Sequence, residues 1–158
     1  MHPRAAEFTE QAREQYGVDL AVEEFPEGTK TAADAAAAVG CDVAQIASSL
    51  AFRAGSELVV VVTSGANRVS EARLADHLGV ESGEVEMADP DRISESLGWS
   101  IGGVPPFCHA SDVTVLFDET LLSFETVWAA AGTPAAVFPM APDEIRRLAD
   151  ARVVDVTG

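Results

Sequence analysis

The side chains best suited to nucleophilic or metal chemistry are two cysteines and three histidines. Cys108 and His109 are neighbours, so a thiol stands beside a possible base. A cysteine nucleophile needs that base, and a third group that orients it, within hydrogen-bond reach. Adjacent loop residues rarely point together, which favours an unreactive thiol at Cys108. A structural zinc centre needs four converging ligands, and we expect no metal site because the spacing is wrong among His2, Cys41, His77, Cys108 and His109.

A glycine- and proline-rich loop, Gly102-Gly103-Val104-Pro105-Pro106, is the most informative stretch of the chain. Glycine permits positive φ and close approach of the backbone to a ligand, whereas proline fixes φ and removes donors. Such a stiff loop can recognise a small polar group through main-chain hydrogen bonds, or it can be an ordinary connector, and the residues alone leave both open. It lacks the Lys-Ser/Thr of a P-loop, and G-x-G-x-x-G is absent, so no cofactor is expected.

The charge is strongly acidic. Asp and Glu total 26 against 10 basic residues, of which Lys30 is the only lysine, and the net charge is −16. Tight nucleic-acid binding normally uses a basic patch. We interpret the charge as an adaptation to high salt, where the Debye length falls to roughly 3 Å at 1 M. The net charge then reflects the salt concentration of the environment and does not indicate the kind of binding partner. Arg53, Arg68 and Arg73 are candidates for phosphate contacts, although surface salt bridges are the commoner role for such residues.

Length and composition indicate one globular domain over residues 1–158. A chain of 158 residues that is 47% hydrophobic can bury a core without disulfides. Two cysteines are too few for a disulfide framework. No apolar run approaches the 18 residues of a membrane span, and the first residues lack the apolar centre of a signal peptide. We therefore expect a soluble cytoplasmic protein, either a monomer or a weak homodimer.

The elements that must position the loop alternate irregularly along the chain. The apolar run 58–62 predicts a central strand buried on both faces, and Asp89-Pro90 predicts the cap and first residue of a helix. The mixture favours an α+β fold with a mixed sheet over a doubly wound one. Helices are expected at 5–16 (in an N-terminal extension, 1–17), 35–39, 70–78, 90–97 and 142–149, with a short turn at 42–46, and strands at 20–25, 48–54, 58–63, 84–88, 113–117, 126–130, 136–138 and 153–156.

The order of several motifs resembles the YbaK family of aminoacyl-tRNA deacylases, the prolyl-tRNA-synthetase-associated editing domains. The resemblance covers roughly residues 20 to 157. It rests on Thr31-Ala32-Ala33-Asp34-Ala35-Ala36, Val39-Gly40, Gln45-Ile46, Ser49-Leu50-Ala51-Phe52, Ser64-Gly65-Ala66-Asn67-Arg68-Val69, Arg73-Leu74-Ala75, Gly102-Gly103-Val104-Pro105-Pro106-Phe107, His109, Val115-Leu116-Phe117-Asp118-Glu119-Thr120-Leu121-Leu122 and Ala131-Gly132-Thr133-Pro134.

The resemblance implies a single compact α+β domain whose mixed, partly barrel-like sheet is flanked by short helices and forms one pocket. It implies hydrolysis of the ester that joins a mischarged small amino acid to the 3′ acceptor end of tRNA, without a cofactor. The glycine loop would present backbone groups near the reacting carbonyl. The implied catalytic positions are Ser48, Gly102, Gly103 and Val104, and the implied substrate-binding positions are Lys30, Thr31, Ser49, Pro105, Pro106, Phe107, His109, Asp118 and Gly132.

One departure from the family pattern concerns catalysis. The family often has Gln-Ile-Val-Lys-Thr/Ser-Leu, and its lysine is important for deacylation, whereas Ser48 stands at that position here. The protein can be an active deacylase that uses backbone amides, water and the ribose hydroxyl. It can instead be a module that binds acyl-tRNA ends or a small ligand without hydrolysis. The role of the lysine can also have moved elsewhere, and Lys30 is one possible source of a cation.

Two further residues have alternative roles. Asp118 follows an apolar strand, where capping the next turn is the commoner role for an aspartate, although it could also face the pocket. Trp99, next to the glycine loop, is either a lid or stacking platform for the terminal adenine or part of the core. A smaller departure is Cys108, because many family members have glycine between the Phe and the His.

Overall fold

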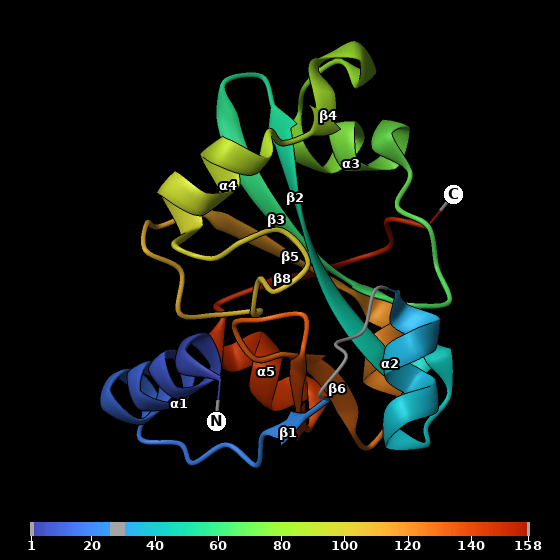
Figure 1. Cartoon of the computed structure of the whole chain (residues 1–158). Helices are drawn as coiled ribbons and strands as arrows, with labels where there is room; N and C mark the ends of the chain where they lie inside the picture. Colours follow the sequence, from blue (N-terminus) through green and yellow to red (C-terminus); the bar gives the residue numbers. More distant parts are fainter. Residues whose placement is uncertain (1, 26–30, 158) are drawn as a thin grey trace.

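The computed structural model describes residues 2–25 and 31–157, which form five α-helices and one mixed sheet of eight strands (Figure 1). The helices are α1 (Pro3–Tyr16), α2 (Ala32–Val39), α3 (Glu71–Leu78), α4 (Pro90–Leu97) and α5 (Pro142–Leu148). The strands are β1 (Glu23–Glu24), β2 (Ile46–Ala54), β3 (Glu57–Ser64), β4 (Val85–Met87), β5 (Thr114–Asp118), β6 (Val127–Ala130), β7 (Ala136–Met140) and β8 (Arg152–Val154). This arrangement confirms the predicted α+β class.

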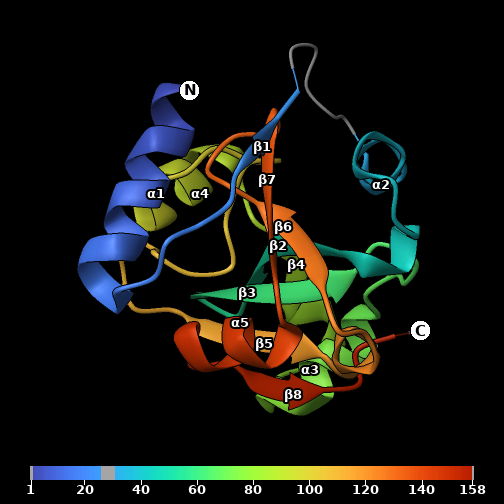
Figure 2. The ribbon, with the colours of Figure 1, turned by 90° about the horizontal axis from the view of Figure 1, so that it is seen from below.

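The strand order is β1-β7-β6-β2-β3-β5-β8, and β4 pairs separately with β2. Strands β2 and β3 form an antiparallel hairpin, whereas β2–β6, β3–β5 and β5–β8 are parallel pairs. Figure 2 shows that β6 and β7 run across the direction of β3, β5 and β8, so the sheet twists sharply at β2. As a result, β2 has two short partners, β6 and β4, along its outer edge.

The predicted central strand at 58–62 is confirmed. Leu58 to Val62 are all buried, because β3 lies between β2 and β5 with apolar side chains against both of its faces. On one face Val60 and Val62 pack in the core that also contains Phe8 of α1. On the other face Val59 and Val61 pack in a core that includes residues of α3.

The strands predicted at 48–54 and 136–138 are too short, since β2 begins at Ile46 and β7 ends at Met140, and two other predictions place strand ends wrongly. The segment predicted at 20–25 pairs only through Glu23 and Glu24, at the sheet margin against β7, although its apolar residues Leu20 and Val22 pack on the core. The last strand ends at Val154 rather than 156. The Asp155 carboxylate accepts hydrogen bonds from Thr157, and the Val156 carbonyl accepts one from the Ser70 amide, so the chain leaves the β5 ladder there.

The start of α4 agrees with the expected cap, whereas the helix expected at 35–39 begins earlier, at Ala32; at both starts a side-chain acceptor satisfies an exposed amide. The Thr31 hydroxyl accepts from the Asp34 amide, and the Asp89 carboxylate accepts from the Asp91 amide. Pro90 is the first residue of α4, as predicted. These caps fix where α2 and α4 begin, and both helices border the pocket described next.

Candidate functional site

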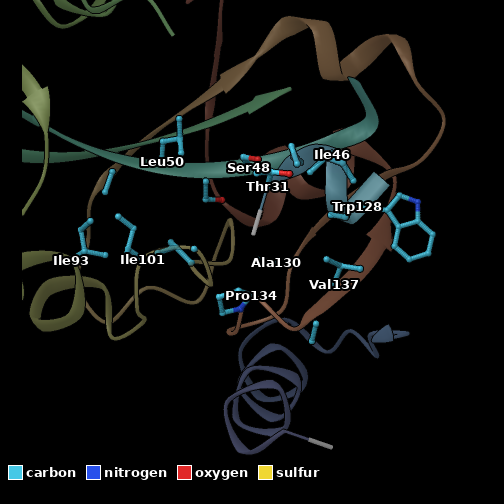
Figure 3. A pocket seen from close by; sticks show the side chains of 18 of the residues that line it. Thr31, Ile46, Ser48, Leu50, Ile93, Ile101, Trp128, Ala130, Pro134 and Val137 are labelled. Atoms are coloured by element: carbon cyan, nitrogen blue, oxygen red, sulfur yellow. The ribbon is translucent and has the colours of Figure 1, made fainter. Parts of the chain in front are cut away.

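One cavity of about 550 Å³ lies against β2, between α2, α4, the loop after α4 and the β6–β7 hairpin (Figure 3). Its size is within the range of about 300–1,000 Å³ that is typical of small-molecule sites. Most of its lining is apolar, and Ser48 and Ser49 lie near the middle of the β2 segment that lines it. The lining residues are Thr31, Ala32, Ala35, Ile46, Ala47, Ser48, Ser49, Leu50, Ala51, Met87, Ile93, Ile101, Gly102, Val104, Trp128, Ala130, Pro134, Ala136 and Val137.

No described residue that lines the cavity is ionisable. Of the three arginines considered for phosphate contacts, Arg53 forms an ion pair with Glu86 and Arg73 with Asp155, and Arg68 is exposed outside the cavity. These pairs are the surface role that the sequence favoured for both arginines. Any stabilisation of developing charge by the described lining must therefore come from hydroxyls and main-chain dipoles.

The glycine loop reaches the cavity through two residues, Gly102 and Val104. Gly102 has φ +87°, a backbone conformation that L-residues with a side chain rarely adopt, and it packs near Pro134. Gly103 lies behind it, where a Cβ atom would come within 2.7 Å of the Thr133 Cα. The loop is thus held by backbone-to-backbone packing against the turn of the β6–β7 hairpin, and it lines the cavity as well as connecting two elements.

The second half of the loop belongs to the core. Pro105 and Pro106 are buried and do not line the cavity. Phe107 is 1% exposed and packs against Phe8 and Phe138. None of these three residues lines the cavity.

Cys108 and His109 do not form a catalytic pair. The His109 Nε2 lies 2.8 Å from the Pro105 carbonyl oxygen, and burial lowers the pKa of the imidazole, although that hydrogen bond opposes the shift. Burial raises the pKa of the Cys108 thiol to about 12, so the thiolate needed for nucleophilic attack is scarce at neutral pH. The burial of Cys108 fits the unreactive thiol that the sequence favoured.

Asp118 is a buried structural carboxylate. Its oxygens accept hydrogen bonds from the Thr63 hydroxyl, the Ser64 amide, the Asn67 side chain and the Thr120 amide. Burial opposes ionisation, but these four bonds outweigh it and hold the pKa of Asp118 below its usual range. The residue caps the turn at Glu119–Ser123, as the sequence favoured, and it does not line the cavity.

Gly132 and Trp99 lie on the α1 side of the molecule. A Cβ atom on Gly132 would come within 2.8 Å of both the Arg4 carbonyl oxygen and the Trp99 ring. Trp99 is 2% exposed, stacks edge-to-face on Phe8, and donates from its indole nitrogen to the Cys108 carbonyl. The core role is therefore the correct one of the two that the sequence left open for Trp99.

The structure brings five of the proposed site residues together at the cavity: Thr31, Ser48, Ser49, Gly102 and Val104. Gly103, Pro105, Pro106 and Phe107 are buried and do not line it, and neither do His109, Asp118 and Gly132. Lys30 lies outside the described residues. The sequence reasoning missed the apolar lining, whose clearest available signal was the amphipathic pattern that points Ile93 inward. The missed residues include Met87, Ile93, Ile101, Ala130, Pro134 and Val137.

Comparison with known proteins agrees with this arrangement. A family model described as an aminoacyl-tRNA editing domain matches residues 26–148. The uncharacterized protein YwhH of Bacillus subtilis (strain 168) is 30% identical over 144 residues, which is 90% of each chain. A proline–tRNA ligase of Lysinibacillus sphaericus (strain C3-41) is 32% identical over 102 residues, 65% of this chain and 18% of that enzyme.

A solved structure carries the similarity across the whole chain. The crystal structure of a candidate trans-editing enzyme for prolyl-tRNA synthetase superposes with a TM-score of 0.93, at 35% identity, and the match covers 100% of this chain and 99% of that one.

Within residues 2–25 and 31–157, no helix is long and apolar enough to cross a membrane.

Proposed function

The chain belongs to the aminoacyl-tRNA editing domain family, and we propose that it is a deacylase that acts in trans on mischarged tRNA. The substrate is the ester between a small amino acid and the 3′-terminal ribose. The single observation that carries this proposal is the cavity: it is apolar, is bordered by main chain from β2 and the glycine loop, and has room for an aminoacyl group with its ribose.

The reaction is hydrolysis of an ester. Water adds to the ester carbonyl carbon, the bond from that carbon to the ribose oxygen breaks, the ribose oxygen takes a proton, and the amino acid leaves as its carboxylic acid. The carbonyl oxygen carries negative charge in the tetrahedral intermediate, and main-chain N–H groups that are already in place stabilise it. In the glycine loop the Gly103 amide is engaged by the Ser100 carbonyl, so the candidates there are the amides of Gly102 and Val104.

The proposed selectivity is by size. Ile93 and Val104 are buried side chains at the wall, and Ala47 and Ala51 form part of the β2 surface. A difference of one methylene in such a pocket is worth only about 1–3 kcal/mol. This modest discrimination suits removal of small amino acids that a synthetase active site admits by mistake.

The test is a deacylation assay in multimolar KCl. The protein is incubated with tRNAs charged with Ala, Cys, Ser and Pro, and loss of the acyl group is measured, while circular dichroism verifies that the protein is folded. We expect selective hydrolysis of one ester at a rate well above the spontaneous one. Hydrolysis of none of the four by a folded sample would contradict the proposal.

A second candidate, a binding module without hydrolytic activity, is favoured by one observation. No described lining residue is cationic, and Ser48 occupies the position at which the family resemblance implies a lysine. Such a module would hold an acylated tRNA end or a similar small ligand in the same cavity.

The variant Ser48→Lys separates the two candidates. For an active deacylase, adding the cation changes an existing single-turnover rate, whereas for a binding module it creates a rate where none was measurable. Ser111→Lys is the matched control, because it adds the same charge at an exposed position outside the cavity. Equal activation by both variants would mean that the effect comes from net charge alone.

A further inference from the structure

The outer edge of β2 has a gap in its hydrogen-bond ladder at Ser49. Strand β6 pairs with β2 only through Ile46 and Ala47. Strand β4 pairs with residues 52–54, and the Ala88 amide extends this pairing by donating to the Ala51 carbonyl. Neither strand reaches Ser49, which lies between them.

The main-chain groups of Ser49 point into this gap. The Ile46 carbonyl accepts from the Gly65 amide on the β3 side, whereas the Ala51 carbonyl accepts from Ala88 on the outer side. Because successive residues of a strand direct their N–H and C=O groups to opposite edges, residues 47, 49 and 51 face outward. The cavity is lined by consecutive β2 residues from Ile46 to Ala51, that is, from both faces of the strand (Figure 3). It therefore lies directly at the open edge.

The side chain of Ser49 gives an independent sign of a missing partner. Among the described residues, its hydroxyl is the buried side-chain oxygen or nitrogen that has no hydrogen-bond partner. Buried polar atoms are nearly always paired, and an unpaired one lowers stability. The unpaired hydroxyl belongs to the same residue as the unpaired edge, and it lines the same cavity.

We propose that the aminoacyl group of the ligand fills this gap as if it were a single added strand residue. Its carbonyl oxygen accepts from the Ser49 amide, its α-ammonium donates to the Ser49 carbonyl, and the Ser49 hydroxyl accepts a second ammonium hydrogen. An antiparallel hydrogen-bonded pair exchanges these same two main-chain bonds, and peptides bind to open sheet edges in the same way. The proposal rests on the proposed function, since it takes the aminoacyl ester as the ligand.

The register also places the side chain of the bound amino acid. Residues directly opposite each other in an antiparallel pair have their side chains on the same face. The amino-acid side chain then lies beside that of Ser49, on the face where Ala47 and Ala51 pack in one core with Ile93 and Val104. The main chain of Ser49 thus holds the part common to every amino acid, and the apolar wall selects among side chains.

Amide hydrogen exchange, measured by NMR in the salt at which the protein is folded, tests the proposal. The probe is 3′-deoxy-3′-(L-alanylamino)adenosine, in which an amide replaces the scissile ester, and its partner is the 3′-propionylamino compound, which lacks the α-ammonium. In the free protein we expect fast exchange at Ser49 and slow exchange at Ser48 and Leu50, whose amides face β3. The alanyl probe should slow Ser49 exchange at least about tenfold, and the propionyl compound should bind at least about tenfold more weakly.

A pair of variants adds a readout that a purely structural role would not produce. Ser49→Ala removes the unpaired hydroxyl, so the variant should melt about 2–4 °C higher and yet bind the alanyl probe several-fold more weakly. Ser49→Thr keeps the hydroxyl and should retain more of the binding than Ser49→Ala. A lower melting temperature with unchanged binding in Ser49→Ala would overturn the role of the hydroxyl.

The outcomes for the two proposals are distinguishable. If the alanyl probe binds without slowing exchange at Ser49, or if both probes bind equally, the strand-edge inference is wrong while the proposed function stands. If neither probe binds and a folded sample hydrolyses no aminoacyl ester, both are wrong.

Discussion

Replacing Gly103 by alanine should destabilise the protein and deform the cavity wall. A Cβ atom at this position would lie 2.7 Å from the Thr133 Cα, 2.9 Å from its nitrogen and 3.0 Å from its carbonyl carbon. These are backbone atoms, so no change of rotamer relieves the contact, and either the glycine loop or the Thr133 turn must move. Overpacking of this kind costs about 1–3 kcal/mol.

The expected loss is measurable by thermal unfolding. For a chain of this size, 1 kcal/mol corresponds to about 2–4 °C, so Gly103→Ala should lower the melting temperature by about 2–12 °C. Gly83→Ala is the matched control, because a Cβ there meets nothing within 4 Å and the residue does not have positive φ. The deacylation rate should also fall, because the movement displaces Gly102 and Val104. Equal melting temperatures for Gly103→Ala and Gly83→Ala would refute the packing argument.

Two further predictions concern buried ionisable groups. Asp118 has a folded-state pKa below the unfolded value of about 3.9. Its contribution to the free energy of unfolding is therefore present above about pH 4 and is lost as the pH falls through the folded-state pKa. The free energy of unfolding of Asp118→Asn should therefore be lower by about 1–3 kcal/mol at pH 7. Measured by urea unfolding, it should also fall less steeply at acid pH than that of the wild type; parallel curves of stability against pH would contradict this. In the native protein at pH 8, Cys108 should resist maleimide while the partly exposed Cys41 reacts. Mass spectrometry should therefore find one label without denaturant and two labels with it. Fast double labelling of the native protein would contradict the burial of the Cys108 thiol.

Local signals in the sequence were sufficient for most of the fold. Asp89 and Pro90 predicted a helix start because a cap depends on residues within three positions, and the apolar run at 58–62 identified the strand that is buried on both faces. The ends of β1 and β8 were wrong because they depend on long-range pairing and on the Asp155 turn.

The site was predicted less completely for a related reason. The resemblance placed Gly132 and His109 in the site. In the structure neither lines the cavity, because Gly132 packs closely against α1 and His109 is hydrogen-bonded to the Pro105 carbonyl. The open edge at Ser49 arises because β6 stops short of it and β4 begins beyond it. That gap depends on how β2, β4 and β6 pair, and these strands lie far apart in the sequence, so no local sequence pattern predicts it.

The central claim, that this cavity is where the ester is hydrolysed, is tested most directly by blocking it. Ala130 is a partly buried residue of β6 at the cavity (Figure 3), and Ala130→Phe places a ring there. Ala72→Phe, at an exposed position on α3 outside the cavity, is the control. Single-turnover deacylation of the preferred charged tRNA should fall to the spontaneous rate in folded Ala130→Phe and stay near the wild-type rate in Ala72→Phe. A wild-type rate in folded Ala130→Phe would show that the hydrolysis takes place elsewhere.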